Sequence, residues 1–237
     1  DRSRPTVLKT RYLGGQQQIV RVDREEAGPA AKNLEARLIE EIEDAVDACD
    51  VIVASDYGKG VLTDAVLAAL FKAAAAASKP VLVDPKRANF ADYRGATLIT
   101  PNRKELTGAV GLPCESDEQA ALATQAAIAA AGAAILLTRS EKGMGLYRQD
   151  QPPVLLGAEA REVFDVSGAG DTVVATFALA LAAGLGMEQA MRLANAAAGV
   201  VVMKLGTATV STTELIAALR PRRDAAPASL TALAEAK

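Results

Sequence analysis

The run Gly168-Ala169-Gly170-Asp171 stands where an apolar, helix-periodic segment begins. The first N–H groups of a helix have no partner within the helix and point outward, with the positive end of the helix dipole behind them. Glycines at 168 and 170 let an anion approach these groups closely. An anion site beside the Asp171 carboxylate suits phosphoryl transfer to a hydroxyl, because the carboxylate accepts the hydroxyl proton while the N–H groups stabilise the transferred group.

The same run is also typical of a tight turn followed by a helix that Asp171 caps, and helix-start preferences alone favour that interpretation. Two other phosphate motifs are excluded. The run lacks the third glycine of the dinucleotide fingerprint and does not open the first strand–helix–strand unit. The segment Tyr57–Val61 has the wrong spacing for a Walker A loop, with no Ser or Thr after Lys59.

The composition restricts the chemistry further. The chain has 237 residues and no histidine. This excludes Ser-His-Asp and Cys-His catalysis and imidazole metal sites, so we expect a carboxylate base and a hard cation on oxygen ligands. The net charge of −3 argues against a nucleic-acid partner. Cys49 and Cys114 are expected to be reduced thiols, and the lack of a signal-peptide pattern or a membrane-spanning apolar run predicts a cytoplasmic protein.

The elements that must position the run alternate along the chain. Short apolar strands followed by polar loops are expected within 50–58, 80–86, 96–102 and 133–143. Helical periodicity covers 30–48, 63–77 with Thr63 as N-cap, 115–132, 169–183 and 187–202. This order predicts a mainly parallel sheet covered by helices on both faces. Two strands around Gly14-Gly15 and a hairpin-like region at 145–158 complete the pattern.

Every expected strand ends in a polar cluster. The carboxyl ends of parallel strands meet at one edge of a sheet, where ligands bind in this class of fold. Loops are polar in most proteins, but four successive clusters favour a ligand site. The side chains expected at this edge are Asp56, Lys59, Asp84, Lys86, Asn102, Glu105 and Glu141.

Taken together, three segments resemble the ribokinase-like (PfkB) family of sugar kinases. They are "DVSGAGDTV" (165–173), "TPNRKE" (100–105) and "ANAAAGVVVMKLGTATVS" (194–211). The resemblance implies a three-layer α/β/α sandwich with a mainly parallel sheet and a small β lid, which residues 6–24 fit. It also implies a kinase domain over residues 1–220 that uses ATP and Mg²⁺, with K⁺ as a further ion.

The family's functional residues fall on named positions of this sequence. The resemblance implies that Asp171 is the catalytic base and that Gly168, Ala169 and Gly170 form an anion hole. Asn102 and Glu105 match the family's N-x-x-E motif, with Glu105 holding Mg²⁺ through water; a helix capping box is the alternative. The nucleotide contacts implied are Thr138, Ser140, Glu141, Gly143, Asn195, Ala198 and Val202. Asp165 and Ser167 would hold a monovalent cation, unless Asp165 only fixes its loop through backbone hydrogen bonds.

A narrower resemblance is to the kinase halves of bifunctional heptose enzymes of lipopolysaccharide core synthesis. It rests on "QQQIVRVD", "SDYGKGVL", "VDPK", "LTRSEKGM" and the segment 194–211. It implies ATP-dependent phosphorylation of D-glycero-β-D-manno-heptose 7-phosphate at O1, giving the 1,7-bisphosphate. Arg11 suits the 7-phosphate, though it is equally an ordinary exposed strand residue. Lys59 and Lys86 would neutralise phosphate charge.

The sequence departs from the family pattern at its start. Members normally begin with a strand whose aspartate grips the sugar and with a Gly-Gly loop, and neither precedes Asp1. We therefore expect an N-terminally incomplete kinase domain with apolar surface exposed where those strands would lie. We also expect a homodimer, with the linker-like tail at 221–237 leading toward a nucleotidyltransferase domain. Another PfkB-type sugar or sugar-phosphate kinase, or a non-catalytic nucleotide-binding fragment, is the alternative.

Overall fold

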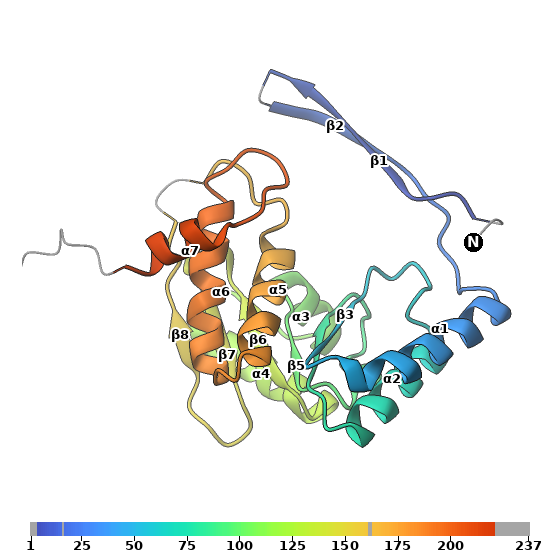
Figure 1. The fold of residues 1–237 in the computed structure, drawn as a ribbon. Helices are drawn as coiled ribbons and strands as arrows, with labels where there is room; N and C mark the ends of the chain where they lie inside the picture. Colours follow the sequence, from blue (N-terminus) through green and yellow to red (C-terminus); the bar gives the residue numbers. More distant parts are fainter. Residues whose placement is uncertain (1–3, 16, 161–162, 221–237) are drawn as a thin grey trace, which may run out of the picture.

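Six short strands form the central sheet, in the order β3-β4-β5-β6-β7-β8, in a computed structural model that describes residues 4–15, 17–160 and 163–220 (Figure 1). Strands β3 to β6 pair in parallel, and β7 pairs antiparallel with β6 on one side and with β8 on the other. Their bounds are Ile52–Ser55 (β3), Val81–Asp84 (β4), Leu98–Ile99 (β5), Ala134–Thr138 (β6), Met144–Tyr147 (β7) and Val154–Leu156 (β8). The predicted tail at 221–237 lies outside the described residues.

The central strands are mainly apolar because both of their faces are buried. On β4, Val81 and Val83 face one core while Leu82 faces the other, and none of the three is more than 1% exposed. Side chains alternate across a strand, so a sheet covered on both sides needs apolar residues at every position. The structure is therefore a three-layer sandwich with a mainly parallel sheet, as the sequence predicts.

The two outer layers come from different parts of the chain. One core lies under the helices α2 (Asp64–Ala76), α3 (Arg103–Val110) and α4 (Asp117–Ala131), with α1 (Lys32–Ala45) packed on α2. The other lies under α5 (Ala169–Ala182) and α6 (Met187–Val201), with α7 (Thr212–Leu219) against α6. Short 3-10 turns lie at Val46–Ala48, Phe90–Tyr93 and Ser140–Lys142. Among the described residues, no helix has the length and apolar character to cross a bilayer.

Local signals explain where several helices begin. The Thr63 hydroxyl accepts a hydrogen bond from the N–H of Val66 at 3.2 Å, which confirms Thr63 as the N-cap of α2. The apolar pattern predicts no helix over residues 103–110, but they form α3, which ends at Gly111 in the left-handed region with φ of 69°. A helix of eight residues is too short to show clear periodicity, so its caps define it better than its apolar pattern does.

The first two strands form a separate hairpin, β1 (Leu8–Gly14) with β2 (Gln17–Arg24), which stands away from the sandwich (Figure 1). The register pairs Tyr12 with Val20 and Arg11 with Arg21, so one face is mainly apolar and the other mainly charged. The apolar face remains open to solvent, with Leu8, Tyr12, Val20 and Val22 between 47% and 57% exposed. On the sandwich, edge strand β3 leaves Val53 43% exposed.

Candidate active site

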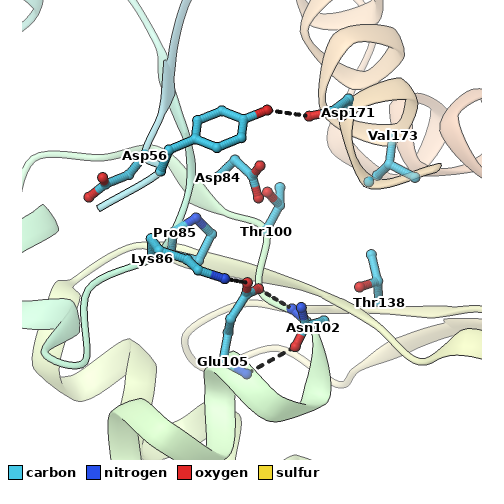
Figure 2. A pocket seen from close by; sticks show the side chains of 12 residues that line it. Asp56, Asp84, Pro85, Lys86, Thr100, Asn102, Glu105, Thr138, Asp171 and Val173 are labelled. Carbon is cyan, nitrogen blue, oxygen red and sulfur yellow. Dashed lines mark hydrogen bonds and ion pairs between the residues drawn. The ribbon is translucent and has the colours of Figure 1, made fainter. Parts of the chain in front are cut away.

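A pocket of about 250 Å³ lies where the parallel strands end (Figure 2). Four successive strands and the start of α5 contribute to it, so the prediction that the polar strand ends meet is confirmed. Its lining comprises Asp56, Tyr57, Asp84, Pro85, Lys86, Thr100, Asn102, Glu105, Thr138, Gly170, Asp171 and Val173. Lys59 and Glu141, also predicted at this edge, are outside the lining.

The first turn of α5 is open toward this pocket. Gly168 is the N-cap, with φ of 79°, and no side chain caps the helix. Among the described residues, the backbone N–H groups of Gly170 and Asp171 take part in no hydrogen bond. A Cβ built on Gly170 would meet nothing within 4 Å. The helix start thus combines unpartnered donors with free space, which is the arrangement that binds an anion.

Asp171 is the third residue of α5 and its side chain is exposed at the pocket. The Tyr57 hydroxyl donates to its Oδ1 atom over 3.5 Å, so the tyrosine side chain extends to the carboxylate. The negative charge of Asp171, followed by burial, raises the pKa of the Tyr57 hydroxyl. Because α5 has no side-chain cap, the capping interpretation does not describe Asp171. Its role as a base stays a prediction.

The first turn of α3, across the pocket from Asp171, is closed instead (Figure 2). Asn102 Oδ1 accepts a bond from the Glu105 N–H at 2.9 Å, and Glu105 Oε2 accepts one from the Asn102 N–H at 3.0 Å. This is the capping box that the sequence left as the alternative interpretation. The second oxygen of Glu105 lies 3.4 Å from the Lys86 ammonium, so the carboxylate still borders the pocket (Figure 2). A metal role for Glu105 stays a prediction.

Asp84, at the end of β4, faces both helix starts. Burial, followed by the charges of Glu105 and Asp171, raises its pKa to about 6. The pocket therefore holds more negative charge than its own side chains neutralise. Among the described residues no cluster of three or more Asp, Glu, His or Cys could enclose a metal ion. The donor set fits a divalent cation that takes most of its ligands from water and phosphate oxygens.

The predicted nucleotide residues separate into two groups. Near the pocket, Thr138 lines the wall, and Ser140 and Glu141 form the turn that follows it, where Glu141 pairs with Arg103 at 3.2 Å. Gly143 closes this turn, and a Cβ there would lie 2.1 Å from the Leu156 carbonyl oxygen. Glycine is thus required at 143 by packing against β8.

The second group lies on α6 and does not line the pocket. Asn195 is 4% exposed, and its amide donates a 2.9 Å hydrogen bond to the Gly157 carbonyl. Ala198 packs partly buried against the second core. The Val202 carbonyl accepts a bond from the Phe164 N–H at 2.8 Å, which ties the end of α6 to the loop before α5.

Asp165 fixes that loop through backbone hydrogen bonds. Its carboxylate accepts bonds from the Ser167 N–H at 2.8 Å and the Gly206 N–H at 3.2 Å. These bonds, chiefly the one from Ser167, lower the pKa of the Asp165 carboxyl. The loop-fixing interpretation is thus present in the structure, while a monovalent cation at Asp165 and Ser167 stays a prediction.

The predicted basic residues are distributed over three elements. Arg11 lies on the charged face of the hairpin. Lys59 forms an ion pair with Glu25 where the hairpin joins the sandwich, and only Lys86 reaches the pocket. Sequence analysis assigned no role to Tyr57 or Thr100, which also line the pocket. An aromatic residue inside the polar cluster "SDYGKG" is the signal that would have identified Tyr57.

Comparison with known proteins places these features in a family. Residues 1–214 match the family described as pfkB family carbohydrate kinase. The chain is 54% identical to the bifunctional protein HldE of Azorhizobium caulinodans over 92% of this chain and 46% of that protein. It is 50% identical to the bifunctional protein HldE of Paramagnetospirillum magneticum over 91% and 44%. The chain thus spans about half the length of the curated relatives it matches.

Solved structures show the same fold at low sequence identity. Arabidopsis thaliana ribokinase, complexed with ribose and ATP, matches with a TM-score of 0.71 and 21% identity over 86% of this chain and 66% of that one. Escherichia coli phosphofructokinase-2, in complex with potassium, matches with a TM-score of 0.71 and 19% identity over 84% and 65%. The predicted ribokinase-like sandwich is therefore confirmed.

Proposed function

Because this chain belongs to the pfkB family of carbohydrate kinases, we propose that it transfers a phosphoryl group from ATP to a hydroxyl of a sugar. The observation that carries the proposal is the open first turn of α5, with Asp171 beside it in a pocket at the strand ends. To catalyse phosphoryl transfer, a protein must position the reacting groups and stabilise the charge on the transferred phosphoryl group, and the proposed site serves both needs.

Each of these residues has its own role in the proposed transfer. Asp171 accepts the proton of the attacking hydroxyl, which makes the oxygen a better nucleophile. The N–H groups of Gly170 and Asp171, together with the dipole of α5, stabilise the negative charge on the phosphoryl oxygens. Lys86, which also lines the pocket, adds a positive charge that offsets the repulsion between the phosphoryl group and the acidic side chains.

The cofactors follow from the charge of the pocket. In this proposal Glu105 and Asp84 hold Mg²⁺ through water, and the ion neutralises charge on the phosphates of ATP. The nucleotide occupies the side of the site bordered by Thr138, Ser140, Glu141 and Gly143, and it extends toward Asn195, Ala198 and Val202 on α6. K⁺ at Asp165 and Ser167 is supported by the relative solved in complex with potassium.

For the acceptor we propose D-glycero-β-D-manno-heptose 7-phosphate, phosphorylated at O1. Support comes from the motifs shared with bifunctional heptose enzymes and from 54% and 50% identity to two proteins named HldE. In this proposal Arg11, on the charged face of the hairpin, and Lys59, at its base, bind the 7-phosphate.

A coupled assay of ADP release tests the proposal. We expect turnover with the heptose 7-phosphate to exceed turnover with fructose 6-phosphate and with ribose. Preference for one of the latter sugars would replace the acceptor but keep the kinase. ATP binding by calorimetry without turnover on any sugar would leave the alternative of a non-catalytic nucleotide-binding fragment.

We also propose that two copies of the chain associate through their hairpins. An isolated two-stranded hairpin is only marginally stable in water. Here four large side chains on its apolar face are about half exposed, as at a surface that binds a partner. Tyr12→Ser with Val22→Ser should convert a dimer into a monomer in analytical ultracentrifugation. A species of unchanged mass would exclude this face as the interface.

A further inference from the structure

A buried tyrosine joins two of the loops that form the pocket. The Tyr93 hydroxyl donates a 2.8 Å hydrogen bond to Asp56 Oδ2. It accepts bonds from the backbone N–H groups of Lys86 at 3.1 Å and Arg87 at 3.0 Å. A tyrosine hydroxyl has one proton to donate and accepts through its lone pairs, so this group makes full use of its capacity. Tyr93 itself lies on neither loop, and it is fully buried.

Asp56 completes the connection on the side of β3. Its side chain is 5% exposed, and its Oδ1 atom accepts a 2.7 Å hydrogen bond from the Gly58 N–H. Its own backbone N–H donates to the Asp84 carbonyl at 2.9 Å. The Arg87 guanidinium lies 3.5 Å from Oδ2 and supplies a positive charge. Apart from the bond from Tyr93, the polar contacts of this carboxylate among the described residues are with Gly58 in its own loop and with Arg87 in the loop that follows β4.

These two loops carry side chains on opposite sides of the proposed reaction. Loop 56–60 holds Tyr57, whose ring reaches toward Asp171, and the loop after β4 holds Lys86, which reaches Glu105 (Figure 2). A displacement of one loop relative to the other would separate the proposed base from the charges that face the phosphates. Errors of about 1 Å in such positions are sufficient to slow a reaction by about 10²-fold.

The bond between Tyr93 and Asp56 is suited to fix this spacing. Hydrogen bonds to a charged group are stronger than those between neutral groups, and a buried acceptor left unpaired carries its desolvation penalty without compensation. Burial raises the pKa of the Tyr93 hydroxyl, so it keeps its proton and remains a donor throughout the physiological range. The ring is held in the first core beside Phe90, with ring centroids 6.0 Å apart.

We propose that Tyr93 and Asp56 are positioning residues for the transfer, because their buried hydrogen bond sets loop 56–60 and the loop after β4 at the spacing that the reaction requires. The proposal rests on the proposed kinase function. Neither residue touches the reacting atoms; both act through Tyr57, Lys86 and the side chains that these contact.

The substitution Tyr93→Phe tests the proposal in the full chain. It removes one hydroxyl and leaves the aromatic packing in place. We expect kcat to fall about tenfold, with a raised KM for the sugar phosphate and a KM for ATP within about twofold of the original. Tyr147→Phe is the matched control, because Tyr147 is also buried in the first core and its hydroxyl makes no hydrogen bond among the described residues. Unchanged kcat and sugar KM in Tyr93→Phe, with only a lowered melting temperature, would overturn the proposal.

Substitutions at Asp56 show whether the pair acts as one unit. The Asp56 carboxylate uses one oxygen for Gly58 and the other for Tyr93, and Asp56→Asn keeps only one of these acceptors, so it should retain part of the activity that Asp56→Ala loses. Combining Asp56→Ala with Tyr93→Phe should slow the reaction no more than the worse single change, as expected of residues that share one interaction. Independent, additive losses would contradict the proposal.

A third measurement does not depend on activity. The chain has no tryptophan, so Tyr57→Trp introduces a single fluorescent reporter on loop 56–60. Adding Tyr93→Phe should increase its quenching by acrylamide, whereas adding Tyr147→Phe should not. Identical quenching in the three proteins would overturn the positioning role, even if the chain proves to be a kinase. A clear difference would support it, even if the acceptor sugar is not the one proposed.

Discussion

Two helices begin at the wall of the same pocket, and their first turns differ. At α3, the side chains of Asn102 and Glu105 satisfy two backbone N–H groups through a capping box. At α5, no side chain caps the turn, and glycines occupy positions 168 and 170. Unpaired N–H groups at a helix start are normally satisfied by a cap, by water or by a ligand.

The first turns of the two helices therefore serve different purposes in the proposed site. The closed turn of α3 holds a carboxylate at a fixed place, since Glu105 is tied to its own helix and to Lys86. The open turn of α5 keeps its donors available for a ligand, and Asp171 accompanies them. One helix start is therefore capped by its own side chains, and the other leaves its donors open, as the proposed anion site requires. The predictions that follow test this division, beginning with the largest effect.

The largest effect is expected from Asp171→Asn, which removes the proposed base and keeps the size of the side chain. Because a positioned base contributes about 10²–10⁴-fold to a rate, kcat should fall about a thousandfold. The dissociation constant of ATP, measured by calorimetry, should change little. Turnover near that of the original chain would remove Asp171 as the base.

A smaller loss of activity is expected from Gly170→Ala. The new methyl group enters the space through which an anion approaches α5, so kcat/KM for ATP should fall about tenfold or more. The fold should tolerate it, because alanine is favoured over glycine in helices by up to about 1 kcal/mol. Gly108→Ala, in α3, is the matched control and should leave activity unchanged, since a Cβ there also meets nothing within 4 Å. Equal kinetics for the two variants would mean that the open turn binds no anion.

The pH dependence of stability tests the carboxyl group that lies between the two helices. The pKa of Asp84 is raised to about 6 by burial and by the charges of Glu105 and Asp171. A raised pKa means that the folded state binds the proton more tightly than the unfolded state, so this stabilisation is lost as the pH rises through about 6. Asp84→Asn should therefore gain stability relative to the original chain between pH 5 and 7.5, in urea unfolding with divalent ions chelated. A constant difference across this range would contradict the assignment.

The smallest effect is expected at the closed turn. Asn102→Ala removes the cap of α3 and should lower the free energy of unfolding by about 1 kcal/mol. Glu105→Gln, in contrast, preserves a side chain that can complete the capping box but removes its charge, so it should keep the stability and raise the Mg²⁺ concentration required for half-maximal activity. If both variants lose only stability, Glu105 is a cap and has no part in binding the cation.

The sequence was sufficient to predict the layers and the place of the site. Continuous apolar strands such as Val81–Val83 indicate burial on both faces, and polar residues after each strand indicate one ligand-binding edge. It could not decide between the two interpretations at α3 or at α5, because a capping box and a ligand site use the same residue types. Only the geometry shows that Asn102 caps its helix and that Asp171 does not.

Other features depend on contacts between residues far apart in the chain. Tyr93 meets Asp56 across 37 positions, and Asn195 meets Gly157 across 38. Such contacts arise from the packing of turns and helices on the sheet, and no local pattern encodes them. The burial of Asn195, whose sequence context is similar to that of a nucleotide-contacting segment, shows why a motif alone does not fix what a side chain touches.

The hairpin is in close backbone contact with the sandwich at its base, and this contact determines how it could move. Gly60 lies so close to the hairpin connection that a Cβ on it would overlap the Gly28 carbonyl, and the Ala30 N–H donates a 2.8 Å bond to the Gly60 carbonyl. The hairpin is thus held at one end. With seven residues in β1 at about 3.3 Å each, it is about 23 Å long, so a rotation of about 10° at its base would move the tip by about 4 Å. A small rotation at the contact between Gly60 and Gly28 would therefore move the arginines of the hairpin over a much larger distance.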